Sequence, residues 1–193
     1  MLTKKIAVLF SGGGSNLEAI LERLHGKVFG ETRIEVALTL TNKANAGGIA
    51  KAAKYGLKSV VIEHVNFASR EEFDAAVVEE IKRANVDLTV LAGFMRILTP
   101  VFTRQIRAIN LHPSLLPLFK GAHAIKESFD SDMKVGGVSV HWVSEELDGG
   151  KIIAQRAFEK SAGMSFEAYE AKIHAIEHEI LPETIVQILT NKE

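Results

Sequence analysis

The sequence predicts an α/β fold with a mainly parallel, twisted β-sheet, helices on both faces of that sheet and a mixed edge towards the C-terminus. Two observations lead to this prediction. Between residues 6 and 92, apolar runs of strand length alternate with segments whose apolar residues recur at helical spacing. The chain has 193 residues, of which 47% are hydrophobic and 24% charged, so it can form one ordinary globular domain and is too apolar to stay disordered.

A glycine cluster separates the first predicted strand from the first predicted helix. Residues 6–10 are continuously apolar, as expected of a strand buried on both faces, and Ser11-Gly-Gly-Gly-Ser-Asn16 follows at once. A helix should come next, because apolar residues recur at helical spacing at Leu17, Ile20, Leu21 and Leu24.

The same alternation of strand and helix continues along the chain. Residues 34–41, 58–62 and 88–92 are predicted strands, and residues 47–55 form a predicted helix. Residues 109–112 form a short fifth strand. Such a βαβ series predicts parallel pairing of its strands.

Three further helices are predicted from their start signals and apolar stripes. A Ser-x-x-Glu capping box at Ser69 begins the first, and Pro100 can begin a short second one. The tail, residues 165–190, is the third, and we expect it to be kinked near Pro182. The apolar stripe of the helix after Ser69 consists of Phe73, Val77, Val78 and Ile81.

The strand–helix alternation does not continue in the C-terminal part of the sequence. Pro113 and Pro117 predict an irregular loop after the fifth strand. Two β-rich runs, residues 138–143 and 152–158, flank Asp148-Gly149-Gly150, which is a hairpin-like signal. These runs supply the mixed edge of the sheet.

Composition excludes several classes of function. The chain has no cysteine, which excludes disulfides, zinc–thiolate sites and thiol nucleophiles. Its 23 basic and 24 acidic residues give a net charge of -1, so no basic surface for nucleic acid is expected. Lys4 and Lys5 precede an apolar run too short for a signal peptide, and no stretch approaches the ~18 apolar residues of a membrane span. We therefore expect a cytoplasmic protein with no nucleic-acid or membrane partner.

The glycine loop has the position of a phosphate site, since it lies between a parallel strand and the positive end of a helix dipole. A dinucleotide is not expected: counted from Gly12, the sixth position is Leu17 rather than Gly, and the second strand ends in Leu40-Thr41-Asn42 with no acidic residue for a ribose. The triphosphate P-loop motif is also missing. The loop therefore predicts a monophosphate site, or merely a tight turn in which Ser15 or Asn16 caps the helix. The phosphate donors would be Gly14, Ser15 and Asn16.

An amide and an imidazole lie together at the end of the fifth strand. Asn110 and His112 are two apart in a strand, so they project from the same face. An amide donor beside an imidazole can hold a carbonyl oxygen and move a proton. Asp148 is the candidate to stabilise the imidazolium of His112 and fix its orientation, although an Asp-Gly turn is the alternative.

Two other chemistries have weaker signals. His174 and His178 lie one helical turn apart, but without a third clustered ligand in the local sequence no metal site is predicted. A serine in a nucleophile elbow is also missing, which favours direct transfer over a covalent acyl intermediate. Residues 95–98, at the carboxyl end of a strand, could line an apolar cleft or pack in the core.

Taken together, the motifs resemble those of phosphoribosylglycinamide formyltransferases, the folate-dependent enzymes of purine synthesis. The resemblance spans nearly the whole chain, and its Asn-x-His-Pro-Ser-Leu-Leu-Pro part extends to the wider formyltransferase superfamily. The segments that carry it are Ser11-Gly-Gly-Gly-Ser-Asn-Leu17, Ala92-Gly-Phe-Met-Arg-Ile-Leu98, Asn110-Leu-His-Pro-Ser-Leu-Leu-Pro117, Val138-Ser-Val-His-Trp-Val143 and Glu146-Leu-Asp-Gly-Gly150.

The resemblance implies a role for each matching residue. The ribonucleotide phosphate is expected on Gly14, Ser15 and Asn16, and the glycinamide end on Glu177. The catalytic trio is expected to be Asn110, His112 and Asp148. The implied folate site consists of Arg70, Met95, Arg96, Ile97, Leu98, Asn110, Ser144, Glu145, Glu146, Leu147 and Asp148.

Two positions depart from the family's pattern. Lys120-Gly121-Ala122-His123 stands where a Pro-Gly pair is typical before a histidine, so this loop should be less rigid and Lys120 adds a positive charge near the substrate. His174 stands where a glutamine is typical of the substrate-binding tail. Neither departure touches the catalytic trio.

The expected activity is formyl transfer from 10-formyltetrahydrofolate to the amine of 5'-phosphoribosylglycinamide, in de novo purine biosynthesis and without a metal. We expect a single Rossmann-like formyltransferase domain over residues 1–193, with a nucleotide-binding half (1–109) and a catalytic and folate-binding half (110–193). A monomer and a homodimer are both open. The alternatives are hydrolysis of formyltetrahydrofolate, whose enzymes usually carry a further N-terminal domain, and a non-catalytic sugar-phosphate binding protein. Formyl transfer to methionyl-tRNA is disfavoured because no basic excess is present.

Overall fold

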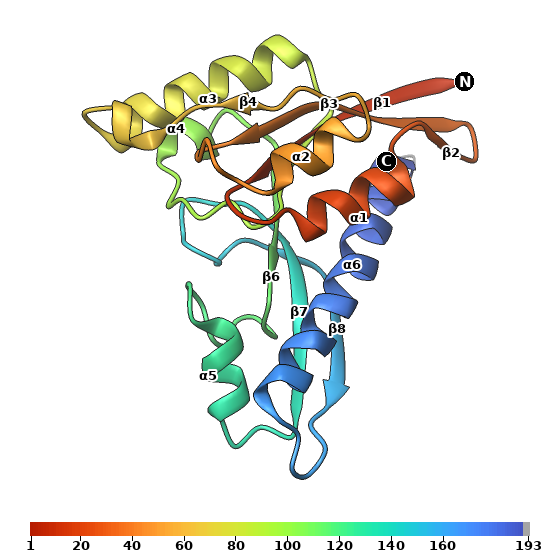
Figure 1. Cartoon of the computed structure of the whole chain (residues 1–193), viewed down its shortest axis with the longest axis vertical. Helices are drawn as coiled ribbons and strands as arrows, with labels where there is room; N and C mark the ends of the chain where they lie inside the picture. Colours follow the sequence, from red (N-terminus) through yellow and green to blue (C-terminus); the bar gives the residue numbers. More distant parts are fainter. Residues whose placement is uncertain (191–193) are drawn as a thin grey trace.

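The computed structural model describes residues 1–190 and contains one eight-stranded sheet with helices on both faces (Figure 1). The strands are β1 (Leu2–Phe10), β2 (Lys27–Phe29), β3 (Thr32–Thr41), β4 (Val60–Val61), β5 (Leu88–Leu91), β6 (Ala108–His112), β7 (Val135–Trp142) and β8 (Ile152–Glu159). The helices are α1 (Ser15–Leu24), α2 (Gly48–Ala53), α3 (Arg70–Ala84), α4 (Pro100–Thr103), α5 (Ala124–Asp130) and α6 (Phe166–Thr190), with a short 3-10 turn η1 (His64–Asn66).

The strand order is β2-β3-β1-β5-β6-β7-β8, and β4 pairs with β3 outside this path. β1 is parallel to both β3 and β5, β5 is parallel to β6, and the outer strands β2, β7 and β8 are antiparallel to their neighbours. The predicted α/β class, with a mainly parallel sheet and a mixed C-terminal edge, is therefore confirmed. From β1 the chain continues to β3 on one side of it, and it later enters β5 on the other side. The strand order therefore reverses at β1, and open α/β sheets bind ligands at such a topological switch point.

The central strand is buried on both faces, as its sequence predicts. Ile6, Val8 and Phe10 belong to the core cluster that α1 and α6 cover, whereas Ala7 and Leu9 belong to the cluster on the side of α3 and α4. Because the strand is sandwiched in this way, its carboxyl end is held rigidly, and the glycine loop that follows starts from a fixed point.

The helix start signals are also confirmed. Ser69 Oγ accepts a hydrogen bond from Glu72 N at 3.1 Å, and the Glu72 carboxylate accepts one from Ala68 N at 3.2 Å. Pro100 opens α4, but the hydroxyl of the preceding Thr99 donates to another helix instead of capping its own.

Several elements differ from the sequence prediction. β2 and α5 were not expected, since a three-residue edge strand and a seven-residue helix carry too little periodicity to stand out. The β7–β8 connection is a long loop rather than a tight hairpin. The predicted tail helix is present as α6, from Phe166 to Thr190 with the buried Pro182 inside it and packed against α1 and β7, and the kink near Pro182 stays a prediction.

None of the helices within residues 1–190 combines the length and the apolar character that a membrane span requires.

Candidate active site

The glycine loop places the N-terminus of α1 at the switch point beside β1, with no side-chain cap on it. Gly14 precedes α1 in the left-handed conformation (φ 71°), and a Cβ there would lie 2.6 Å from Gly48 Cα, so glycine is needed for conformation and for space. The first intrahelical bond runs from Glu18 N to Gly14 O at 2.9 Å, so the amides of Ser15 and Asn16 have no acceptor in the helix itself.

The alternative that Ser15 or Asn16 caps the helix is wrong. Within residues 1–190, Gly14 occupies the cap position and no side chain makes a capping hydrogen bond to α1. Asn16 instead points its amide at another helix. The helix terminus therefore keeps its unpaired donors, which is the arrangement that binds anions.

A buried carboxylate lies beside this terminus. Glu177, on α6, is 5% exposed, and its Oε2 accepts a hydrogen bond from Asn16 Nδ2 at 3.2 Å. His174 Nδ1 approaches the same oxygen at 2.8 Å. The hydrogen bond to Glu177 raises the pKa of the half-exposed His174, so a positive charge partly balances the carboxylate.

The two tail histidines do not share a ligand geometry. His174 is paired with Glu177, whereas burial lowers the pKa of His178. Across residues 1–190, no group of three or more histidine, aspartate or glutamate side chains is placed to hold a metal ion.

The expected catalytic trio is brought together at the carboxyl end of β6. Asp148 Oδ2 lies 3.5 Å from His112 Nδ1, and its Oδ1 lies 3.4 Å from Asn110 Nδ2. Oδ2 also accepts a hydrogen bond from Gly121 N at 2.9 Å. Because the carboxylate faces side chains and backbone from three segments, Asp148 does more than shape a turn.

The backbone that carries Asp148 is strained and tightly packed. Asp148 itself has φ 50°, a left-handed conformation that costs most residues about 1–2 kcal/mol and that aspartate tolerates better. Gly150 lies so close to the carbonyl of Trp142 that any Cβ would overlap it. The Asp-Gly-Gly sequence therefore serves to turn the carboxylate inward.

His141 joins the trio, although the sequence analysis gave it no role. β7 pairs His141 directly with Asn110, and its Nε2 lies 3.2 Å from Asn110 Nδ2 and 3.7 Å from Asp148 Oδ1. Its Nδ1 lies 2.9 Å from the Trp142 carbonyl, which requires a proton on Nδ1 and leaves Nε2 as an acceptor. Burial lowers the pKa of His141, which favours this neutral form.

The loop after β6 folds back onto the trio. His112 Nε2 donates to the carbonyl of Phe119 at 2.7 Å, and Ser114 Oγ donates to the carbonyl of Leu118 at the same distance. Lys120, the departure from the family's pattern, forms an ion pair with Glu146 at 2.7 Å. The two loops that flank His112 are thus tied together.

The segments expected to bind folate expose apolar side chains. Met95 is 59% exposed, Ile97 56% and Leu147 49%. Two loops with such side chains around one buried polar cluster are typical of the lining of a ligand site with an apolar part and a polar end. Arg96 lies over the Phe73 ring at 5.6 Å, and its buried Nε has no hydrogen-bond partner among the described residues.

The expected folate residues are not all brought together. Glu145 is paired with Arg104 at 2.6 Å, and Ser144 Oγ donates to the Glu146 carbonyl, so both shape their own loop. Leu98 packs against the core. Arg70 is exposed at the start of α3, and within residues 1–190 no hydrogen bond or ion pair joins its side chain to the others.

A buried aspartate supports the far end of residues 93–99. Asp74 Oδ2, on α3, accepts hydrogen bonds from Thr99 N at 2.6 Å and from Thr99 Oγ1 at 2.8 Å. Burial raises the pKa of Asp74. Nothing in the sequence singled out this residue, because an aspartate in a helix is normally a solvated one.

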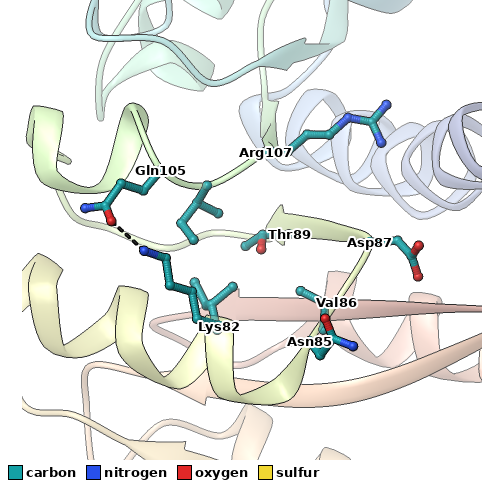
Figure 2. Close-up of a pocket in the computed structure, with 9 residues that line it drawn as sticks. Lys82, Asn85, Val86, Asp87, Thr89, Gln105 and Arg107 are labelled. Carbon is teal, nitrogen blue, oxygen red and sulfur yellow. Dashed lines mark hydrogen bonds between the residues drawn. The ribbon is translucent and has the colours of Figure 1, made fainter.

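A separate cavity of about 280 Å³ lies at the opposite, amino end of β5 (Figure 2). Two of its charged residues have polar partners, since Lys82 Nζ donates to Gln105 at 2.6 Å and Asp87 pairs with Lys4 at 2.8 Å, and Arg107 lies over the Trp142 ring at 4.9 Å. Ligands of open α/β sheets bind at the carboxyl ends of the strands. The carboxyl edge therefore remains the candidate active site.

The site combines an open helix N-terminus, exposed apolar side chains and a buried cluster of carboxylate, imidazole and amide groups at one edge of a parallel sheet. These features are typical of an enzyme active site. The Formyl transferase family model matches residues 4–185, and the chain belongs to this family.

Relatives of known structure and sequence agree with this assignment. The chain is similar to the crystal structure of phosphoribosylglycinamide formyltransferase from Campylobacter jejuni, with a TM-score of 0.96 and 64% identity over 98% of this chain and 99% of the other. It is 37% identical to phosphoribosylglycinamide formyltransferase of Bacillus subtilis over 96% of this chain and 95% of the relative.

Some relatives are much longer. The trifunctional purine biosynthetic protein adenosine-3 of Drosophila pseudoobscura is 41% identical over 94% of this chain, which corresponds to 13% of the relative's length. The chain thus spans only a small part of those relatives.

Proposed function

We propose that this protein transfers the formyl group of 10-formyltetrahydrofolate to the amine of 5'-phosphoribosylglycinamide, giving the N-formyl product and tetrahydrofolate in de novo purine biosynthesis. The observation that carries the proposal is the convergence of Asn110, His112 and Asp148 between the open helix terminus and the exposed apolar loops. The names of the family's relatives supply the substrate classes.

The ribonucleotide is proposed to bind at α1. Its phosphate would accept hydrogen bonds from the loop amides around Gly14, Ser15 and Asn16 at the positive end of the helix dipole. Glu177 would accept a hydrogen bond from the glycinamide end of the ribonucleotide, since its buried carboxylate already accepts one from the Asn16 amide beside the glycine loop.

The folate is proposed to bind between residues 93–98 and 144–148. Its ring would cover the exposed apolar side chains of Met95, Ile97 and Leu147, and burial of such surface stabilises binding by about 25 cal/mol per Å² before ordering costs. Arg70 and the unpartnered Arg96 guanidinium would interact with the carboxylates of the folate tail.

In the proposed reaction, the amine nitrogen attacks the formyl carbon and the carbonyl electron pair moves onto oxygen. The Asn110 amide donates to Asp148 over a long 3.4 Å contact, which a formyl oxygen can replace. His112 would donate the second hydrogen bond to the oxyanion from Nε2, which exchanges the Phe119 carbonyl at 2.7 Å for the substrate oxygen while Nδ1 stays on Asp148. Collapse of the adduct breaks the bond to N10 of the folate, and the proton that leaves the amine ends on N10 by way of Asp148 or water.

The remaining expectations belong to the same proposal. We propose that the enzyme is cytoplasmic, acts on small-molecule substrates as a monomer or homodimer, and needs no metal. Residues 1–109 would hold the ribonucleotide, and residues 110–193 would supply the catalytic groups, within one domain. No basic surface favours a nucleic acid as substrate, given the net charge of -1.

One assay separates the transferase from a hydrolase. The protein is incubated with 10-formyldideazafolate, with and without phosphoribosylglycinamide, and loss of the formyl group is followed by absorbance. We expect turnover only when the amine is present. Equal turnover in water alone would select the hydrolase, and no turnover in either case would select a non-catalytic binding protein.

A further inference from the structure

Ser11 joins the two segments that form the proposed binding sites. It is the first residue of the glycine loop, and its N–H donates to the carbonyl of Gly93 at 3.0 Å. Its Oγ accepts a hydrogen bond from Met95 N at 2.8 Å. A single residue therefore holds the start of the folate-facing segment at two points.

The hydroxyl of Ser11 is itself fixed from behind. It donates to Asn42 Oδ1 at 2.5 Å, which orients the amide so that Nδ2 faces His64 Nδ1 at 3.1 Å. Asn42 follows β3, and His64 lies in η1. A chain of hydrogen bonds thus runs from the Met95 amide through Ser11 and Asn42 to His64, and the two central residues are 3% and 2% exposed.

Burial makes this chain costly to interrupt. If the Ser11 hydroxyl were removed, the Met95 N–H and Asn42 Oδ1 would both lose their partner, and a buried polar group without a partner is destabilising. The hydrogen bonds do not complete the sheet or cap a helix. Their effect is to fix where residues 93–95 stand relative to the glycine loop.

Both segments that meet at Ser11 are partly exposed, although Phe94 is 7% exposed and Gly12 O accepts a hydrogen bond from Gly48 N at 3.1 Å. Gly12 and Gly13 are open to solvent on one side, and Met95 and Ile97 are more than half exposed on the other. Exposed loops with few packed contacts open at low cost in free energy. Because Ser11 bonds to both segments, a ligand that orders one of them also restrains the other, so less ordering remains for the second ligand to bring about.

We propose that Ser11, oriented by Asn42, is a positioning residue that couples the two binding segments. Ribonucleotide bound at the glycine loop then tightens folate binding at residues 93–98, and folate tightens ribonucleotide binding by the same factor, because coupling between sites is reciprocal. This inference rests on the proposed function, since it assigns one substrate to each segment.

Calorimetry tests the coupling directly. The Kd of 5,8-dideazafolate, which carries no formyl group, is measured with and without saturating phosphoribosylglycinamide. We expect the ribonucleotide to tighten binding by about fivefold or more in the parent and hardly at all in Ser11→Ala. Ser59→Ala is the matched control, because it removes a hydroxyl that bonds only to Thr39 Oγ1, at 2.9 Å, away from both segments.

Hydrogen exchange supplies a second readout at a named atom. The Met95 amide donates to Ser11 Oγ, so ribonucleotide binding should slow its exchange in the parent, although no ribonucleotide atom is expected to touch it. Asn42→Ala keeps the serine but removes its acceptor, and should lose part of the coupling. This variant decides the question if Ser11→Ala does not fold.

The outcomes separate the two hypotheses. A parent protein that binds neither ligand contradicts the proposed function. A parent that binds both, with the same Kd for dideazafolate whether or not the ribonucleotide is present, overturns the coupling. Coupling that persists unchanged in the folded Ser11→Ala or Asn42→Ala variant shows that Ser11 is only structural.

Discussion

Two regions of the molecule use the same three kinds of side chain. At the end of β6, Asp148 faces Asn110 and His112, and at the start of α1, Glu177 faces Asn16 and His174. Each carboxylate is almost fully buried and lies beside an amide and an imidazole, and Asp148 has His141 as a second imidazole neighbour.

The two regions differ in the surroundings of their histidines. His174 is half exposed and faces one carboxylate, which raises its pKa, whereas His141 beside Asp148 is buried and has its pKa lowered. Asp148 also accepts a hydrogen bond from the Gly121 amide at 2.9 Å and lies 3.7 Å from a second imidazole, that of His141. The comparison teaches that burial decides how a histidine beside a carboxylate responds. The half-exposed His174 has its pKa raised by Glu177, whereas burial outweighs the charge of Asp148 at His141 and lowers its pKa.

The largest expected effect comes from removing the charge of Asp148. Asp148→Asn keeps nearly the same shape but takes away the ionic partner of His112, so we expect turnover to fall by about 10²-fold or more. The Kd for the ribonucleotide should change little, because its phosphate is proposed to bind at α1. Steady-state kinetics and calorimetry on the variant measure both quantities.

His112→Ala and the double variant show whether the two residues act together. If they form one unit, the double variant is little slower than the slower single variant. Independent, multiplicative losses would mean that Asp148 only shapes its loop.

The second largest effect is expected at the other carboxylate. Glu177→Gln keeps the size of the side chain but removes the charge shared by Asn16 and His174, and a hydrogen bond to a charged group contributes about 1.5–3 kcal/mol. We expect the ribonucleotide Kd to rise about tenfold or more while the dideazafolate Kd without ribonucleotide stays unchanged. A loss confined to turnover would instead place Glu177 in the chemical step.

The glycine loop allows a matched pair of substitutions. Gly14→Ala forces a Cβ against Gly48 and a left-handed alanine, so we expect about 1–2 kcal/mol lower stability together with a raised ribonucleotide KM. Gly13→Ala is the control, because a Cβ there meets nothing within 4 Å. Denaturant unfolding and KM measurements on both check the assignment, and equal ribonucleotide KM values for the two variants would remove Gly14 from the site.

A smaller effect is the opposite response of the two histidines to pH. The pKa of His174 is raised, so its contribution to stability is present below the unfolded value of about 6.5 and is lost as pH rises through its folded pKa. The pKa of His141 is lowered, so the stability that its neutral form contributes is present above the unfolded value of about 6.5. That stability is lost as pH falls from there towards the folded pKa of His141. The Tm deficit of His174→Gln should therefore shrink between pH 6 and pH 9.

NMR titration reports on each imidazole separately. We expect His174 to titrate above and His141 below the ordinary histidine range. If both titrate together, burial does not distinguish the two regions.

No change at all is expected on removal of divalent ions. His174 and His178 are interpreted as substrate-side or core residues rather than ligands, so dialysis against a chelator should leave turnover intact. Activity that is lost and then restored by one divalent ion would overturn this interpretation.

The sequence was informative wherever local periodicity determines direction. The apolar run of β1 predicted a doubly buried strand, the glycine cluster predicted an open loop at its end, and the spacing of Asn110 and His112 put them on one face. The Asp-Gly-Gly motif made Asp148 a candidate partner of His112, with a turn as the alternative, and the resemblance added Glu177, whose position along the chain has no local relation to its partners.

The sequence was uninformative wherever residues meet across the fold. Asn16 and Glu177 are 161 positions apart, and Asn110 and His141 meet only because β7 runs antiparallel to β6. His141 and Asp74 carry no local signal, since a histidine in a strand and an aspartate in a helix are ordinary residues until their neighbours are known.

By itself, then, the sequence determined the class of fold, the strand ends at which the ligands should bind and the family, because these follow from periodicity and from motifs of adjacent residues. Only the tertiary structure decided which carboxylate faces which imidazole, which histidine is buried, and that Ser11 connects two loops. Charge state and hydrogen-bond partnership depend on burial and on distances of about 3 Å between atoms of remote segments, and packing alone sets those distances.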